Sequence, residues 1–219
     1  MGFLPYDVLL KTTLWVIVMV YLGIIGTYLI LKSIKKEEKS ARSMSHAYAI
    51  FIYLYIVARL FYIFSDYERD SNAETLLYYR YVALAYVFQI LGLLCIIFVL
   101  EKYVIIRTKR IVTYIILVLL GVNIIMFFFP NFIPTVRYIN YGILYFEVAL
   151  LIIIYIYLTL NTTGELRTKA LLTVIAFFTM ITGTILEIDA LSSTGLVLPY
   201  YTPILFAIGA SIFVYAQSK

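Results

Sequence analysis

The sequence predicts an all-α integral membrane protein, a bundle of seven transmembrane helices with its N-terminus outside and its C-terminus in the cytoplasm. Apolar residues make up 64% of the 219 positions and charged residues 13%, about half of their share in a soluble domain. The apolar residues form continuous runs long enough to cross a bilayer. Basic residues gather in alternate connections between these runs.

Seven apolar runs follow one another along the chain. None of them alternates apolar and polar residues, so we expect helices rather than strands. Seven spans use roughly 140 residues, which leaves room only for short connections. We therefore expect one transmembrane domain over residues 1–219, with spans at 8–34, 44–65, 75–102, 111–129, 138–160, 166–191 and 199–217.

The orientation follows from the basic residues of the connections. The connections after the first, third and fifth spans, together with the C-terminus, hold twelve Lys or Arg residues, whereas the opposite side holds Lys11, Arg69 and Arg137. Short cytoplasmic loops carry an excess of Lys and Arg, so the first set is predicted to be cytoplasmic. We expect a multi-pass protein of the cell membrane, whose net charge of +5 reflects topology and not a nucleic-acid partner. The chain begins without the basic region and cleavage site of a signal peptide, so the first span is expected to stay in the protein.

The sequence carries no motif of a metal, cofactor or enzyme site. Its one cysteine, Cys95, can form no internal disulfide, and its one histidine, His46, has no neighbour at metal-ligand spacing. It has no nucleophile elbow, zinc-protease helix or P-loop. Glu187 and Asp189 are two residues apart on a predicted helix and point to different faces. We expect no metal, no cofactor and no enzymatic activity.

Ionisable side chains within the predicted spans are the candidate site. Charge in the hydrocarbon region is costly, so such residues are usually paired or functional. Arg59 and Tyr62 share one face of the second span, and Asn140 and Glu147 share one face of the fifth. On the predicted orientation, most of these groups lie in the outer half of the bundle. The candidate ligand-pocket residues are Arg59, Tyr62, Arg80, Tyr81, Glu147 and Glu187.

Three interpretations of this set stay open. The two arginines and two glutamates nearly balance, as buried charges must, and so could pair with one another and hold the helices together. They could also line an outward-facing pocket for a small polar or lipid ligand. The third interpretation is a path for an ion or a proton.

Two stretches resemble a known family. The third span opens with AETLLYYRYVALAYVFQILG, and the last span, YYTPILFAIGASIFVYA, has Pro203 near its outer end. Both features resemble the seven-helix sensory module of bacterial and archaeal histidine kinases. The topology also resembles microbial rhodopsins, but the last span has no lysine at its middle for retinal. The first resemblance implies a sensor, and because the sequence stops soon after the seventh span, its signal is expected to pass to a cytoplasmic partner.

The sequence therefore supports two functions from different classes. One is a receptor-like membrane sensor. The other is a small-solute transporter built of two three-helix repeats and a linker helix, suggested by the likeness of residues 66–79 to residues 189–201. Transporters usually contain helices broken near the midplane at Gly or Pro, whereas the five prolines here lie near the outer ends of the spans. This placement favours the sensor.

Overall fold

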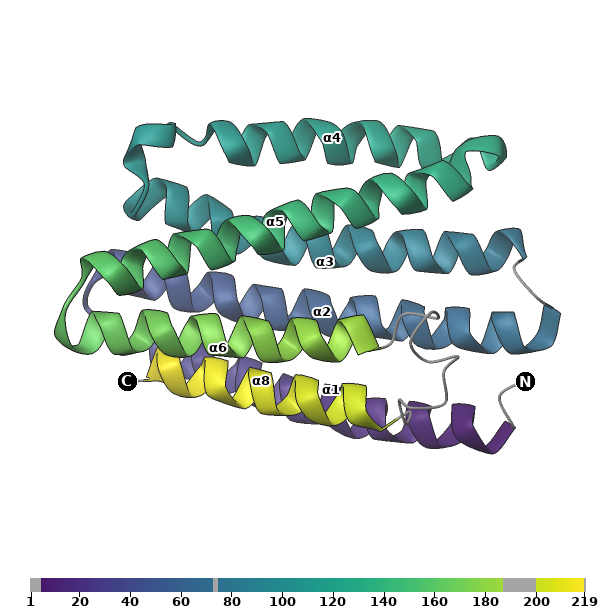
Figure 1. Cartoon of the computed structure of the whole chain (residues 1–219), viewed down its shortest axis with the longest axis horizontal. Coiled ribbons are helices and arrows are strands. Elements are labelled where there is room, and N and C mark those ends of the chain that lie inside the picture. The colour runs from purple at the N-terminus through teal and green to yellow at the C-terminus, as the bar shows by residue number, and fades with distance from the viewer. Residues whose placement is uncertain (1–4, 73–74, 187–199, 219) are drawn as a thin grey trace. The chain divides into compact units, whose positions relative to one another are not determined.

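The computed structural model describes residues 5–72, 75–186 and 200–218, which are helical apart from short turns and include no strand. The all-α prediction is confirmed for this part of the chain (Figure 1). Two short 3-10 helices, η1 (Ile106–Thr108) and η2 (Pro130–Phe132), precede α4 and α5. The α-helices are α1 (Pro5–Ile34), α2 (Lys39–Asn72), α3 (Leu76–Tyr103), α4 (Ile111–Phe127), α5 (Ile133–Asn161), α6 (Gly164–Leu186) and α8 (Tyr201–Ser218).

Five stretches of the described helices are long and apolar enough to cross a membrane. The helices α4 and α8 are also apolar but shorter, with 17 and 18 residues. A helix of 17 residues extends about 25 Å, which is the lower limit for a bilayer core of about 30 Å. The five stretches are Leu9–Ile34, Lys39–Arg69, Leu76–Tyr103, Pro130–Asn161 and Gly164–Thr184.

Several helices extend past the predicted spans. The second span was expected at 44–65, but α2 runs from Lys39 to Asn72, because its polar ends continue the helix beyond the apolar core. The fifth was expected from residue 138, but α5 begins at Ile133. Pro134 is compatible with this start, since proline is tolerated in the first turn of a helix. Residues 187–191 and 199 of the last two predicted spans lie outside the described residues.

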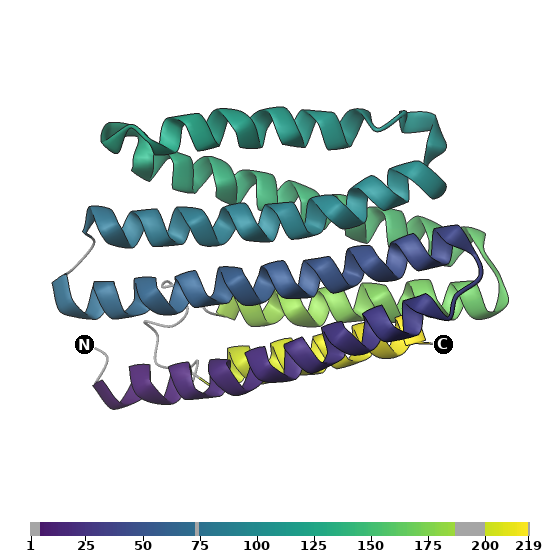
Figure 2. The same cartoon turned by 180° about the vertical axis from the view of Figure 1, so that it is seen from behind.

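The described helices group into two compact units: unit 1 comprises Met1–Ile25 and Leu150–Lys219, and unit 2 comprises Gly26–Ala149. In unit 1, α6 and α8 lie side by side and antiparallel (Figures 1 and 2). A β-carbon added at Gly209 would lie 3.0 Å from the carbonyl oxygen of Ala176. The absence of a side chain at Gly209 is therefore what allows the two helices to approach this closely.

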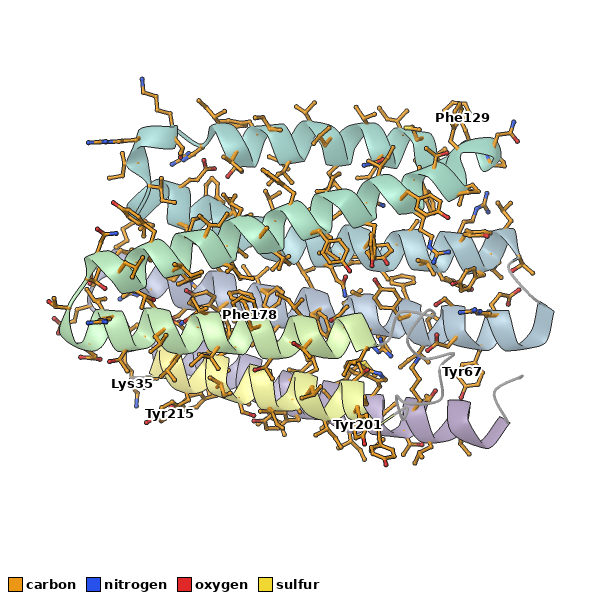
Figure 3. The ribbon with its side chains drawn as sticks, in the orientation of Figure 1. Lys35, Tyr67, Phe129, Phe178, Tyr201 and Tyr215 are labelled. Carbon is orange, nitrogen blue, oxygen red and sulfur yellow. The ribbon has the colours of Figure 1, made fainter. Side chains whose placement is uncertain are left out.

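In unit 2, α2 and α3 form the main antiparallel pair (Figure 2). The hydroxyl of Thr75 caps α3 by accepting a hydrogen bond from the backbone N–H of Tyr78 at 3.2 Å. Lys35 lies at one end of this unit, and Tyr67 and Phe129 lie at the opposite end (Figure 3). The second end is the one where α2 ends and where α3 and α5 begin.

The turn from α3 to α4 is held by a buried acid. Glu101 is only 3% exposed, and its carboxylate accepts hydrogen bonds from the backbone N–H groups of Val112 and Thr113, at 3.3 and 2.9 Å, and from the Thr113 hydroxyl. These N–H groups belong to the first turn of α4, where no carbonyl of the helix can accept them. Lys109 and Arg110 in this turn adopt left-handed backbone angles. Glu101 therefore fixes where α4 starts relative to α3.

Candidate functional site

The candidate site in unit 2 begins with a cation on α2. Arg59 is 3% exposed, and its guanidinium lies over the ring of Tyr62 at 5.6 Å from the ring centroid. The two residues are three positions apart, so the helix itself brings them together. The hydroxyl of Tyr62 donates to Oε1 of Gln89 on α3 at 3.3 Å. Arg59 and Tyr62 are thus oriented into the contact between α2 and α3.

Four tyrosines from three helices continue this site. The ring of Tyr62 on α2 meets Tyr86 on α3 edge to face at 5.8 Å, and Tyr86 meets Tyr141 on α5 edge to face at 5.7 Å. One turn further along α5, the Tyr145 hydroxyl donates to the Tyr141 hydroxyl at 2.6 Å. Edge-to-face rings are a favourable arrangement of aromatic side chains. We call Tyr62, Tyr86, Tyr141 and Tyr145 the tyrosine cluster.

The tyrosine cluster lies well inside unit 2. Tyr62 is ten residues before the last residue of α2, Asn72, and Tyr86 is ten residues after the first residue of α3, Leu76. At 1.5 Å per residue, this places both about 15 Å from that end of the unit along the helix axes. The same end carries Arg137, whose guanidinium lies over the rings of Tyr78 and Tyr79 at 5.7 and 5.8 Å. The cluster therefore has a cation and two further tyrosines on its side toward this end.

A second group of polar side chains is buried on α4 and α5. Asn140 and Glu147 are 0% exposed, and Asn123 is 1% exposed. Within the described part of the chain, both carboxylate oxygens of Glu147, both polar side-chain atoms of Asn140 and Oδ1 of Asn123 have no hydrogen-bond partner. Buried polar groups without partners are rare and costly. Glu147 does lie within electrostatic range of Cys95 on α3.

Five of the six predicted pocket residues lie in the described part of the chain. Arg59 and Tyr62 are in contact, and Glu147 is buried. Tyr81 packs against Phe61 and Phe64 on α2, at ring distances of 6.4 and 5.7 Å. The Nε atom of Arg80 is buried and has no hydrogen-bond partner among the described residues. Glu187 lies outside the described residues.

Sequence reasoning missed the tyrosines that connect the three helices. Tyr86, Tyr141 and Tyr145 are three of 22 tyrosines, and nothing in their spacing shows which helices are neighbours. It also missed Glu101, because this residue falls at the end of an apolar run, where a charged residue at the membrane surface is expected. A signal was present for Tyr141 and Tyr145, because a spacing of four places both on one side of α5.

In unit 1, single hydrogen bonds between side chains link pairs of helices. The hydroxyls of Tyr21 and Ser211 are 2.7 Å apart and link α1 to α8. The side-chain amide of Gln217 donates to the Thr173 hydroxyl at 3.0 Å and links α8 to α6. Each is a single partnered contact of the kind that holds membrane helices together.

No family model, no curated protein and no solved structure matches this chain.

Proposed function

We propose that the chain is a seven-span protein of the cell membrane, with its N-terminus outside and its C-terminus in the cytoplasm. The five long helices supply five of these spans, and the shorter apolar helices α4 and α8 supply the other two. The basic turn between α3 and α4, with Arg107, Lys109 and Arg110, lies at the same end of unit 2 as Lys35. On this orientation, the end with Tyr67 and Phe129 faces outward. On this proposal, residues 1–219 form one transmembrane domain.

Within this topology, we propose a receptor-like sensor with no enzymatic role, whose ligand binds at the tyrosine cluster and whose signal passes to a cytoplasmic partner. The observation that carries the proposal is the cluster itself, in which side chains from α2, α3 and α5 converge about 15 Å below the outer end. Apolar walls with a few converging polar groups are usual for small-molecule sites. The phenols, Arg59 and Gln89 offer donors and acceptors to a small polar ligand or to a lipid headgroup.

The three helices that carry the cluster pass through it unbroken. Each of α2, α3 and α5 is one continuous helix of 28 to 34 residues. Substrate sites of many secondary transporters are formed by discontinuous helices near the midplane, which bring helix ends to the substrate. Continuous helices instead suit a sensor, in which ligand binding causes small shifts of whole helices. This difference favours the sensor over the transporter.

One observation favours the transporter as a second candidate. Tyr78 and Tyr79 at the start of α3 have ring centroids 5.3 Å apart, inclined at 66°. Tyr200 and Tyr201 at the start of α8 have nearly the same geometry, at 5.0 Å and 71°. A repeat of three helices would produce such a correspondence between the third and the last helix. Sustained uptake of a solute by proteoliposomes that is lost in Arg59→Leu would establish the transporter and overturn the sensor.

A thermal-shift screen of the purified protein against polar metabolites and lipids tests the ligand site. A ligand at a hundredfold excess over its Kd should raise the free energy of unfolding by about 2.7 kcal/mol. Tyr141→Phe removes the acceptor of the Tyr145 hydroxyl and should reduce this shift. Tyr138→Phe is the matched control, because Tyr138 lies on the same helix and is 72% exposed. A hit whose shift survives Tyr141→Phe and Arg59→Leu unchanged would place the ligand elsewhere.

The orientation has its own test. Epitope tags at the two termini and in the turn between α3 and α4 are probed from outside sealed vesicles of known sidedness. We expect the N-terminal tag alone to be accessible. If the tag in the turn at Lys109 is accessible instead, the topology is the opposite one, with the tyrosine cluster nearer the cytoplasm.

A further inference from the structure

Two buried glutamates in unit 2 have opposite surroundings. Glu101 accepts two backbone N–H groups and one hydroxyl from α4. Glu147, at the middle of α5, is 0% exposed, and neither of its oxygens has a hydrogen-bond partner within the described residues. The contacts of Glu101 explain its presence as a structural acid. No contact among the described residues explains Glu147.

No described side chain pairs a cation with Glu147. On α3, the Cys95 thiol interacts electrostatically with Glu147, and this thiol is neutral unless it loses its own proton. The helix α4 contains no Asp, Glu, Lys, Arg or His, and its buried polar residues are Thr113 and Asn123. In the described part of the chain, no Lys or Arg nitrogen is within hydrogen-bonding distance of the Glu147 carboxylate. Two turns toward the start of α5, Asn140 lies on the same helix face.

A carboxylate in this position would be an isolated charge in a low-dielectric interior. Such a charge costs far more than a neutral acid, and proteins avoid it by pairing the charge or by keeping the proton on it. Since no pairing cation is present among the described residues, the neutral acid is the form that this site stabilises. The neutral acid has one O–H donor, and Asn140, two turns away on the same helix face, has an amide oxygen without a partner among the described residues.

We propose that Glu147 is a proton-binding site, which holds a proton at neutral pH and exchanges it with water during the protein's working cycle. In the release step, the O–H bond of the Glu147 carboxylic acid breaks, the electron pair stays on the carboxylate, and the proton passes to water. Asn140, whose amide nitrogen and oxygen are both unpartnered within the described residues, lies about 10 Å from Glu147 along α5. Asn123 on α4 provides a further buried amide oxygen without a partner there. Water molecules bound by these amides would connect Glu147 to the end of the unit where α4 meets α5.

This proton site goes beyond the ligand site and does not depend on it. Many proton-driven membrane proteins place an acid within the hydrocarbon region as their exchangeable site. A protein with Glu147 in this role would respond to pH or to a proton gradient, whether or not a ligand occupies the tyrosine cluster. Loss of ligand binding and loss of proton exchange are therefore separate results.

Infrared spectroscopy of the reconstituted protein tests the proposal directly. At neutral pH, the wild-type protein should show the C=O stretching band of a protonated carboxylic acid, and the band should shift in deuterated water. Glu147→Gln should remove this band while folding normally, because the amide closely mimics the neutral acid in size. Glu165→Gln is the control, since Glu165 is an exposed acid paired with Lys169, and it should leave the band in place.

Three outcomes would overturn the proposal. They are the absence of a carboxylic-acid band in the wild-type protein at neutral pH, its persistence in Glu147→Gln, and its failure to disappear when the pH of the wild-type sample is raised. The first and third need no variant, so they decide the matter even if Glu147→Gln does not fold. Asn140→Leu tests the proposed proton route separately from the proton site at Glu147. In this variant we expect the carboxylic-acid band to stay and its exchange with deuterated water to slow. Unchanged exchange in that variant would remove Asn140 from the route.

Discussion

The substitution Gly209→Ala tests how closely α6 and α8 pack in unit 1. A β-carbon at this position would lie 2.6 Å from Cγ of Met180, 3.0 Å from the carbonyl oxygen of Ala176 and 3.1 Å from the backbone nitrogen of Met180. The Met180 side chain can rotate, but the two backbone atoms move only if the helices separate. Overpacking costs about 1–3 kcal/mol, and alanine gains about 0.5–1 kcal/mol over glycine within a helix. The difference is a net loss of about 1 kcal/mol of stability, and at most about 2.5 kcal/mol.

Gly142→Ala is the matched control, because nothing lies within 4 Å of a β-carbon added at Gly142. This change keeps the helix gain without the clash, so it should stabilise the protein by up to about 1 kcal/mol. The free energy of unfolding is measured by titrating the detergent-solubilised protein with sodium dodecyl sulfate. Fluorescence of Trp15, the single tryptophan, follows the transition, since its ring packs 5.9 Å from that of Phe206 in the same unit.

The refuting result is a Gly209→Ala protein as stable as the wild type, together with a stabilised Gly142→Ala protein. That pair of values would show that α6 and α8 do not approach as closely as described. Gly183→Ala provides an intermediate case, because its β-carbon would meet Leu205 and Thr202 atoms at 3.3 Å. Equal losses at all three glycines would instead point to a general effect of replacing glycine.

Two further predictions concern buried charges of unit 2 and use the same unfolding titration. Arg59→Leu should lower the free energy of unfolding by about 3 kcal/mol or more, because it removes a buried charge from its partners, including the Tyr62 ring; a loss below about 1 kcal/mol would show that Arg59 is solvated. Glu101→Gln should cost about 1–3 kcal/mol, because an amide cannot accept on both sides as the carboxylate does at the start of α4. The ion pair of the exposed Glu165 with the half-buried Lys169 gives the comparison, since Glu165→Gln should change stability by about 0.5 kcal/mol or less. Equal effects at Glu101 and Glu165 would contradict the capping role of Glu101.

Helix positions were largely predictable because hydropathy marks the apolar core of a span. The start of the fourth helix at Ile111 was predicted to the residue, since it follows the charged run ending at Arg110. Helix lengths were less predictable. The ends of α2 are polar and lie beyond the apolar run, so hydropathy does not mark where this helix begins and ends.

The candidate site was predictable only within single helices. A spacing of three residues placed Arg59 and Tyr62 on one helix face, and in the structure the Arg59 guanidinium lies over the Tyr62 ring. The contacts of Tyr86 with Tyr62 and Tyr141 join different helices, and one sequence does not show which helix faces pack together. The same limit explains Tyr81, which shares its helix with Tyr86 but packs against Phe61 and Phe64.

Charge balance among buried residues did not predict which side chains interact. Two arginines and two glutamates suggested mutual pairing, which stays a prediction where it involves Glu187, a residue outside the described ones. Charge balance over a chain does not by itself bring particular side chains within reach. Glu147 has no hydrogen-bonding partner among the described residues, whereas Glu101, not considered as a candidate, has three donors. An acid can meet the cost of burial by accepting hydrogen bonds or by keeping its proton, so a glutamate in a span need not imply an arginine nearby.

The tyrosine cluster and Glu147 share α5, and this connection yields a last prediction. Tyr145 and Glu147 are two residues apart, so a shift of α5 caused by a ligand at Tyr141 and Tyr145 also moves Glu147. If ligand binding releases the Glu147 proton, linkage requires that the ligand's affinity rise by up to about tenfold per pH unit while the acid is protonated. Thermal shifts measured with one ligand across a pH series test this, with Glu147→Gln as the pH-independent control. A sensor shows this coupling without net flux, whereas a proton-coupled transporter shows it together with solute uptake driven by a pH gradient. Equal pH dependence in the wild type and in Glu147→Gln would show that the two sites act independently.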